Sequence, residues 1–209
     1  MYSAVILAAG SGTRLGLGYN KLLYELDGKT IIERTVNVFK KDIDCKEIIL
    51  VISKNDEYSM KRLFEDGVKY VIGGATRQES SYNGVSQATC ENVMIHDGAR
   101  PYVSQKELDG CKEKIKECDA CLLMVPVKDT IKFVENGIVK TTPNRNNLMA
   151  ALTPQCFKTT LIKECLEKAM NSTETFSDDA SVVEKMSDIP VHVVQGEYSN
   201  IKITTKEDL

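Results

Sequence analysis

A glycine-rich segment near the N-terminus carries the strongest chemical signal in the sequence. It covers residues 7–21, LAAGSGTRLGLGYNK, and directly follows a short apolar run. Glycines let backbone N–H groups converge on phosphate oxygens, and Arg14 and Lys21 add positive charge. The segment matches neither the P-loop nor the dinucleotide-binding pattern, and a simple turn would need neither cation. We therefore expect a phosphate-binding loop of another kind.

A second polar segment, HDGARP at residues 96–101, follows an apolar run that is typical of a buried strand. It is therefore expected at the carboxyl end of that strand, where open α/β sheets bind ligands. Asp97 and Arg100 are candidates for binding a substrate or a metal there. The alternative is that Asp97 pairs with Arg100 and only holds the loop. We expect His96 to be structural, because it lies beside the strand.

Eight segments in register over essentially the whole chain resemble the 2-C-methyl-D-erythritol 4-phosphate cytidylyltransferases of isoprenoid biosynthesis. The resemblance implies an α/β, three-layer Rossmann-like nucleotidyltransferase fold with a mostly parallel sheet. It also implies transfer of CMP from CTP to the polyol phosphate, with release of pyrophosphate. The segments are AAGSGTR with NK (8–14 and 20–21), GGATRQESSYNG (73–84), HDGARPYV (96–103), VPVKDTIK (125–132), NRNNL (144–148), LTPQCF (152–157), SDDASVVE (177–184) and NIKITTKEDL (200–209).

The resemblance also assigns nucleotide-binding residues. Arg14 and Lys21 match the cations that bind the triphosphate, and Lys21 is expected at the α-phosphate, where charge develops. The attacking phosphate is already an anion and needs no general base. Mg²⁺ is expected to be held mostly by the phosphates, with Asp97 as a possible ligand. Ala75 stands where relatives commonly have an acidic residue. The nucleotide-binding residues are expected to be Ala8, Ala9, Gly10, Gly12, Thr13, Gly73, Arg77 and Ser80.

For the acceptor, the resemblance implies a site built from two subunits. In relatives the arm at about residues 129–148 crosses to the second subunit, so Arg145 would act in its neighbour's site and the protein would be a homodimer. Asp178 and Asp179, at the start of a predicted helix, are interpreted as partners of its N-terminal dipole. The residues expected to bind the acceptor are Asp97, Arg100, Thr130, Arg145, Ser177 and Lys202, with Arg145 and Lys202 also counted as catalytic.

The elements that must position these residues follow from hydrophobic periodicity. Short apolar runs alternate with helical spacing, which is the pattern of βαβ units. Asn136-Gly137, between two short β-rich runs, predicts a hairpin and hence a protruding β-arm. Strands are predicted at residues 3–9, 48–53, 68–72, 92–95, 121–127, 191–194 and 201–204, and helices at 30–40, 55–65, 78–88, 105–117, 158–170 and 178–186.

Composition excludes several classes of protein. The chain has 209 residues, a net charge of −3, 42% hydrophobic and 27% charged residues, all in the ordinary globular range. One domain spanning residues 1–209 is expected. No basic excess points to nucleic acid or a membrane surface, and no stretch approaches about 18 apolar residues. We expect a cytoplasmic protein without membrane or nucleic-acid partners.

The seven cysteines are odd in number and scattered, so we expect buried thiols instead of disulfides. Cys118 and Cys121 form a C-x-x-C pair. A metal or redox role is disfavoured, because no second pair at metal-ligand spacing follows and the sequence continues into an apolar strand.

Other functions stay open at this point. A cytidylyltransferase acting on ribitol 5-phosphate for wall or capsule polymers would have the same fold and a similar ending, although HDGARP favours methylerythritol phosphate. A sugar-1-phosphate nucleotidyltransferase would explain the first loop only. A noncatalytic module would bind CTP without turnover, and the first loop disfavours a dehydrogenase.

Overall fold

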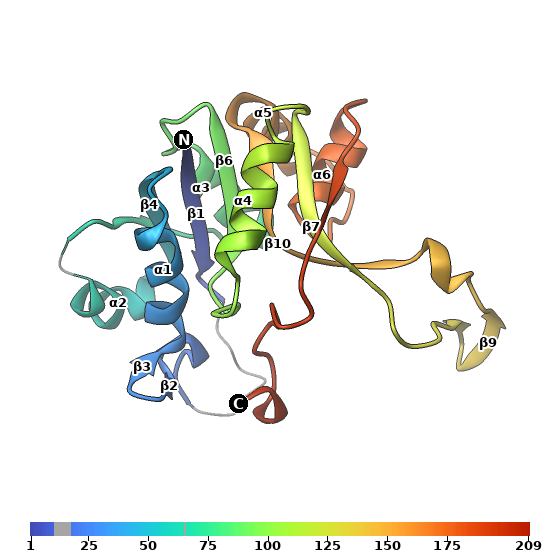
Figure 1. The fold of residues 1–209 in the computed structure, drawn as a ribbon, viewed down its shortest axis with the longest axis horizontal. Coiled ribbons are helices and arrows are strands. Elements are labelled where there is room, and N and C mark those ends of the chain that lie inside the picture. The colour runs from blue at the N-terminus through green and yellow to red at the C-terminus, as the bar shows by residue number, and fades with distance from the viewer. Residues whose placement is uncertain (11–17, 65) are drawn as a thin grey trace.

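The computed structural model describes residues 1–10, 18–64 and 66–209, and it is built around a seven-stranded sheet (Figure 1). The strand order is β11-β7-β10-β6-β1-β4-β5. Every neighbouring pair is parallel except those of β10, which runs antiparallel to β6 and β7. The strands are β1 (Tyr2–Ala8), β4 (Cys45–Ile52), β5 (Lys69–Ile72), β6 (Asn92–Asp97), β7 (Ala120–Pro126), β10 (Met149–Lys158) and β11 (His192–Gln195).

Helices cover both faces of this sheet, so the predicted three-layer α/β architecture is confirmed. Alternate residues of β1 point to opposite faces, with Ile6 packed in one hydrophobic cluster and Val5 in the other. A strand buried on both faces is typical of a parallel sheet. One face carries α1 (Ile31–Lys41), α2 (Glu57–Leu63) and α4 (Gln105–Lys114), and the other carries α3 (Arg77–Val85), α5 (Thr159–Met170) and α6 (Asp179–Met186).

A β-arm projects away from the sheet, as predicted (Figure 1). It contains β8 (Phe133–Glu135) and β9 (Ile138–Thr141), and every residue of both strands is exposed. Asn136 and Gly137 join them with φ values of 50° and 74°. Two consecutive positive φ values are what a two-residue hairpin turn requires, which explains the Asn-Gly pair.

Apart from the short ribbon described below, which was not predicted, the structure differs from the sequence prediction in two strands. β10 was not predicted, because the polar residues and Pro154 within it interrupt the apolar pattern. The strand predicted at residues 201–204 is wrong, since this segment has no regular structure. Among the described residues, its backbone makes one hydrogen bond to the loop after β6, from Ile203 N to Ala99 O at 2.9 Å. It does not form the ladder of hydrogen bonds that defines a strand.

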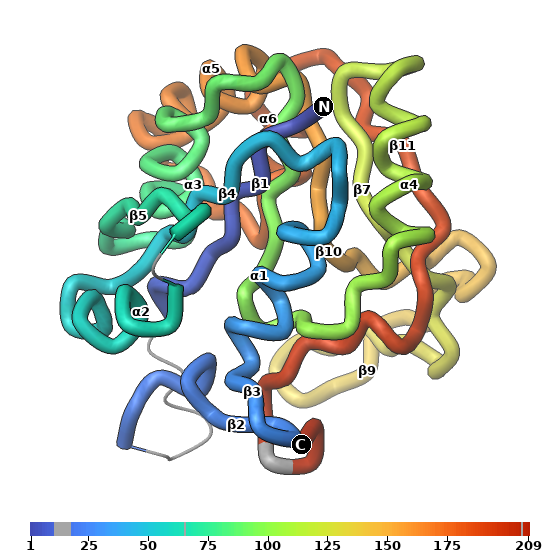
Figure 2. Tube along the Cα trace, turned by 60° about the vertical axis from the view of Figure 1, so that its left-hand side comes forward, coloured from blue at the N-terminus to red at the C-terminus, as the bar shows by residue number. Residues whose placement is uncertain are grey.

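Smaller elements complete the described chain. A two-stranded ribbon, β2 (Glu25–Leu26) with β3 (Lys29–Thr30), lies at the same end of the molecule as the C-terminus (Figure 2). All seven cysteines are among the described residues and have free thiols, four of them buried. None of the described helices combines the length and hydrophobicity needed to cross a membrane.

Candidate active site

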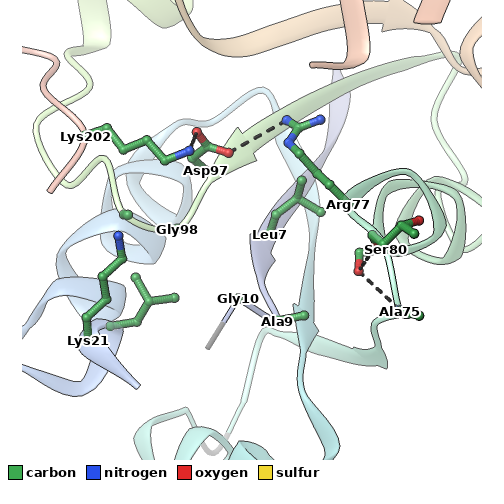
Figure 3. A pocket seen from close by; sticks show the side chains of 14 residues that line it. Leu7, Ala9, Gly10, Lys21, Ala75, Arg77, Ser80, Asp97, Gly98 and Lys202 are labelled. Carbon is green, nitrogen blue, oxygen red and sulfur yellow. Dashed lines mark hydrogen bonds and ion pairs between the residues drawn. The ribbon is translucent and has the colours of Figure 1, made fainter. Parts of the chain in front are cut away.

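A cavity of about 390 Å³ opens where the carboxyl ends of β1 and β6 meet the loop after β5. This is the ligand-binding edge of an open α/β sheet. The charged residues among its described lining are three cations and one carboxylate, although the whole chain is acidic (Figure 3). The described residues that line it include Leu7, Ala9, Gly10, Lys21, Leu22, Gly74, Ala75, Arg77, Ser80, Asp97, Gly98 and Lys202.

Close packing fixes the loop after β5 against Ala9, the residue that follows β1. A Cβ on Gly73 would lie 2.7 Å from Ala9 Cβ and 2.8 Å from Ser80 Oγ, so only glycine fits there. Ser80, nearly buried in α3, donates its hydroxyl to Thr76 O at 2.9 Å and accepts from Gly74 N at 3.1 Å. The hydroxyl proton is therefore already used, and Ser80 faces a ligand as an acceptor only.

Lys21 is positioned by the residue before it. Asn20, only 4% exposed, donates to Asp56 Oδ2 at 2.8 Å and to Ala8 O at 3.3 Å, while its Oδ1 accepts from Leu22 N. These bonds hold the short helical turn that begins at Lys21 against the end of β1. The ammonium of Lys21 reaches Ile203 O at 2.6 Å, across the cavity mouth.

Asp97 is the centre of the charged residues in the cavity. Its carboxylate lies 2.7 Å from Lys202 Nζ and 3.7 Å from both Arg77 Nη2 and Arg100 Nε. Burial would raise the pKa of Asp97, but the attraction of Lys202 and then Arg77 outweighs burial and lowers it to about 2. Asp97 is therefore an anion at neutral pH and a poor general acid or base.

The C-terminal segment that carries Lys202 is anchored by buried polar groups. Glu107, 2% exposed in α4, accepts from Glu197 N at 2.9 Å and from Asn200 Nδ2 at 3.2 Å. Arg100 donates to Asn200 O at 2.7 Å. Arg100 is thus turned toward this segment and away from the cavity, although it was predicted to bind the acceptor.

His96 has the structural setting that was expected. It is fully buried, its Nδ1 lies 2.9 Å from Thr153 Oγ1, and its Nε2 lies 3.1 Å from Arg100 O. Burial lowers the pKa of His96 to about 4, because the charged form loses its hydration. The neutral ring ties β6 to β10 and to the loop after Asp97.

The structure brings about half of the predicted site residues into one cavity. Ala9, Gly10, Lys21, Arg77, Ser80, Asp97 and Lys202 line it, while Ala8 and Gly73 lie directly behind the lining. Thr130 and Arg145 lie on the exposed arm, and Ser177 precedes α6. Gly12, Thr13 and Arg14 lie outside the described residues.

Several polar residues that position the site were not given this role from the sequence. Asp178 lies at the N-terminus of α6, as predicted, and caps it by accepting from Ser181 N at 3.0 Å, but Asp179 is not simply a partner of the helix dipole. It is fully buried and lies 2.7 Å from Arg77 Nη2. Glu107 and Asn200 were also missed, because a polar residue gives no periodic signal for contacts made at long range.

Comparisons with known proteins agree with this geometry. The sequence model of the 2-C-methyl-D-erythritol 4-phosphate cytidylyltransferase family matches residues 2–209. Proteins of that name from Bacillus velezensis and Clostridioides difficile are 41% and 42% identical, covering all of this chain and 92% and 91% of theirs. The crystal structure of 4-diphosphocytidyl-2C-methyl-D-erythritol synthase from Anaerococcus prevotii superposes with a TM-score of 0.89 at 37% identity, covering 100% of this chain and 94% of that one.

Proposed function

The chain belongs to the 2-C-methyl-D-erythritol 4-phosphate cytidylyltransferase family, and on that premise we propose that it transfers CMP from CTP to 2-C-methyl-D-erythritol 4-phosphate. The products are 4-diphosphocytidyl-2-C-methyl-D-erythritol and pyrophosphate. The observation that carries the proposal is that Lys21, Asp97 and Lys202 line one cavity (Figure 3). Two cations and a carboxylate in one cavity suit a reaction between two phosphorylated substrates, one of which also has hydroxyl groups.

In the proposed reaction, a phosphate oxygen of the acceptor attacks the α-phosphorus of CTP while the bond to the β-phosphate oxygen breaks. Negative charge concentrates on the phosphoryl oxygens in the transition state, so catalysis consists of positioning and charge neutralisation. Lys21 would neutralise the α-phosphate, and Lys202 would bind the acceptor phosphate as a point charge. Asp97, held as an anion, would accept hydrogen bonds from acceptor hydroxyls.

Selection of cytosine is proposed to involve Ser80 and the backbone around it. The Ser80 hydroxyl donates to Thr76 O and has only acceptor capacity left. An acceptor suits the exocyclic amine of cytosine and repels the carbonyl oxygen at the same position of uracil. Backbone groups of Ala9, Gly10 and Gly74 line the same side of the cavity and can pair with the remaining base edge.

We propose that Mg²⁺ enters with CTP and is held mainly by its phosphates. Asp97 is the only carboxylate among the described lining residues, and it is surrounded by cations. No group of three or more metal-ligating side chains occurs in the described part of the chain. Asp97 therefore does not fit the role of a protein ligand. When bound, the ion would neutralise phosphate charge, and the residues above would orient the substrates.

The acceptor site is proposed to be completed by a second copy of the chain. Thr130 and Arg145 do not line the cavity of their own chain, and Arg145 Nη1 instead donates to Lys128 O at 2.8 Å. Exposed apolar side chains on the arm, including Phe133 at 51% and Ile138 at 61%, offer a surface for a partner. The proposed assembly is a homodimer in which each arm supplies Arg145 to the other cavity, next to Ser177. The substrates are charged and water-soluble, so the proposed compartment is the cytoplasm.

Phosphorus NMR of a reaction mixture tests the proposal. With CTP, Mg²⁺ and 2-C-methyl-D-erythritol 4-phosphate, the phosphomonoester signal of the acceptor should be replaced by the two coupled signals of a diphosphate diester, together with pyrophosphate. A mixture in which CTP is hydrolysed to CMP, or left intact while the protein binds it, would reject the transfer reaction.

A further inference from the structure

Asp179 is a fully buried carboxylate that the proposed reaction does not use. It is the first residue of α6, whose start is fixed by Gln155 from β10. Gln155 donates to Asp178 Oδ2 at 2.7 Å and accepts from Ala180 N at 2.8 Å. These two bonds leave the Asp179 side chain little freedom to move. Its carboxylate points at Arg77 from α3, with 2.7 Å between Oδ2 and Nη2.

The Arg77 guanidinium lies between two carboxylates. The same Nη2 that is 2.7 Å from Asp179 is 3.7 Å from Asp97 Oδ1. Asp97 has a closer cation on its other side, Lys202 at 2.7 Å. Figure 3 shows Arg77 and Lys202 reaching Asp97 from opposite sides of the cavity. The charges therefore alternate from Asp179 through Arg77 to Asp97, whose Oδ2 faces Lys202 and, at 3.7 Å, Arg100.

The distances decide which pairs dominate. Arg77 forms a close ion pair with Asp179, at 2.7 Å, whereas its guanidinium nitrogen is 3.7 Å from Asp97. Because the attraction between opposite charges weakens with distance, Asp179 holds the guanidinium more strongly than Asp97 does. Among the described residues, Arg77 is the only side chain that pairs with Asp179. A buried carboxylate that lost its cation would be left uncompensated, which keeps the guanidinium on Asp179.

We propose that Asp179 is a positioning residue for acceptor binding, acting through Arg77 on Asp97. By holding the guanidinium, Asp179 prevents Arg77 from closing onto Asp97. The Asp97 carboxylate then stays beside Lys202, with lone pairs available for acceptor hydroxyls. This inference rests on the proposed function, because it assigns Asp97 and Lys202 to the acceptor half of that reaction.

The variant Asp179→Asn tests this relay, by which we mean the action of Asp179 on Asp97 through Arg77. In Asp179→Asn the amide keeps the shape but not the charge, so the guanidinium should move to Asp97 and compete with the acceptor. The KM for 2-C-methyl-D-erythritol 4-phosphate should rise about tenfold, while the KM for CTP stays within about twofold of wild type. A general loss of folding would instead lower kcat and active fraction without separating the two KM values. An unchanged acceptor KM, or an equal rise in both, would overturn the inference.

The double variant Arg77→Gln/Asp179→Asn provides the second test and removes both charges together, so no buried charge is left unpaired. With no guanidinium to close onto Asp97, the acceptor KM should return to within about threefold of wild type. An acceptor KM in the double variant about tenfold above wild type would mean that Arg77 does not transmit the effect. This result would overturn the relay even if the single variant fails to fold, because it is measured against wild type.

The wild-type protein separates this inference from the function on which it rests. If wild type does not turn over CTP with 2-C-methyl-D-erythritol 4-phosphate, the proposed function is rejected and the inference with it. If wild type is active and the variants behave alike toward both substrates, only the relay through Asp179 is rejected.

Discussion

At the scale of single residues, Lys21 carries the largest expected effect on rate. Its ammonium is preorganised by the bonds of Asn20 and lies at the mouth of the cavity. Removing one preorganised donor from a developing oxyanion costs about 3–4 kcal/mol, or two to three orders of magnitude in rate. Lys21→Ala should therefore lower kcat by about that factor, measured by pyrophosphate release. Lys54 is exposed, so Lys54→Ala is the matched control. A Lys21→Ala rate close to that of the control would remove Lys21 from the mechanism.

Ser80 and its neighbour Ser81 allow a paired test of base recognition. Ser80→Ala removes an acceptor from the cavity and a bond to Gly74 N, so the KM for CTP should rise about tenfold, as expected for one lost buried hydrogen bond. Ser81 is fully buried, but its hydroxyl has no hydrogen-bond partner among the described residues, so Ser81→Ala should change little. Equal CTP affinity in both variants would contradict the role given to Ser80.

His96 predicts how stability depends on pH. Its pKa falls from 6.5 to about 4 on folding, so the unfolded chain binds a proton between these pH values that the folded chain does not. Stability must therefore decrease as the pH falls through this window. Between about pH 7.5 and pH 5 the loss from this group should be about 2 kcal/mol in urea unfolding. His96→Gln should lack this part of the pH dependence, and an identical pH profile in the variant would contradict it.

At the scale of elements, the arm is the part for which we propose a function in the cavity of a second chain. Lys21→Ala damages the cavity, whereas Arg145→Ala damages the residue offered by the arm. A mixed dimer contains one cavity in which Lys21 and the neighbour's Arg145 are both intact. Mixing the two inactive variants should therefore restore up to about a quarter of wild-type activity per site, given random subunit exchange. No recovery in a mixture with demonstrated exchange would place Arg145 in its own chain's site, or outside any site.

Sequence periodicity predicted the regular elements well where packing is simple. Buried parallel strands and the Asn-Gly hairpin gave clear signals because one local rule dominates in each. β10 was missed because a strand paired on both sides tolerates Pro154 and polar residues when their side chains find partners, as Gln155 does on α6. The false strand at residues 201–204 has the right alternation but no neighbouring strand to pair with.

At the scale of the whole molecule, the sheet brings together residues from distant parts of the chain. The end of β1 with Ala9 and Gly10, the turn that begins at Lys21, the loop after β5, the end of β6 and the C-terminal segment all meet at one edge (Figure 2). Residue types and resemblance predicted half of the described lining residues. They could not predict that Arg100 turns to Asn200 or that Asp179 pairs with Arg77, because both contacts depend on how α4 and α6 pack.

The most direct test of the central claim is the rate of pyrophosphate release with Mg²⁺ and each pairing of nucleotide and acceptor. CTP with 2-C-methyl-D-erythritol 4-phosphate should be turned over, while UTP, ATP and GTP with the same acceptor should give little release. CTP with ribitol 5-phosphate should also give little release. Preference for ribitol 5-phosphate, or no release with any pair from a folded protein that binds CTP, would contradict the proposed function.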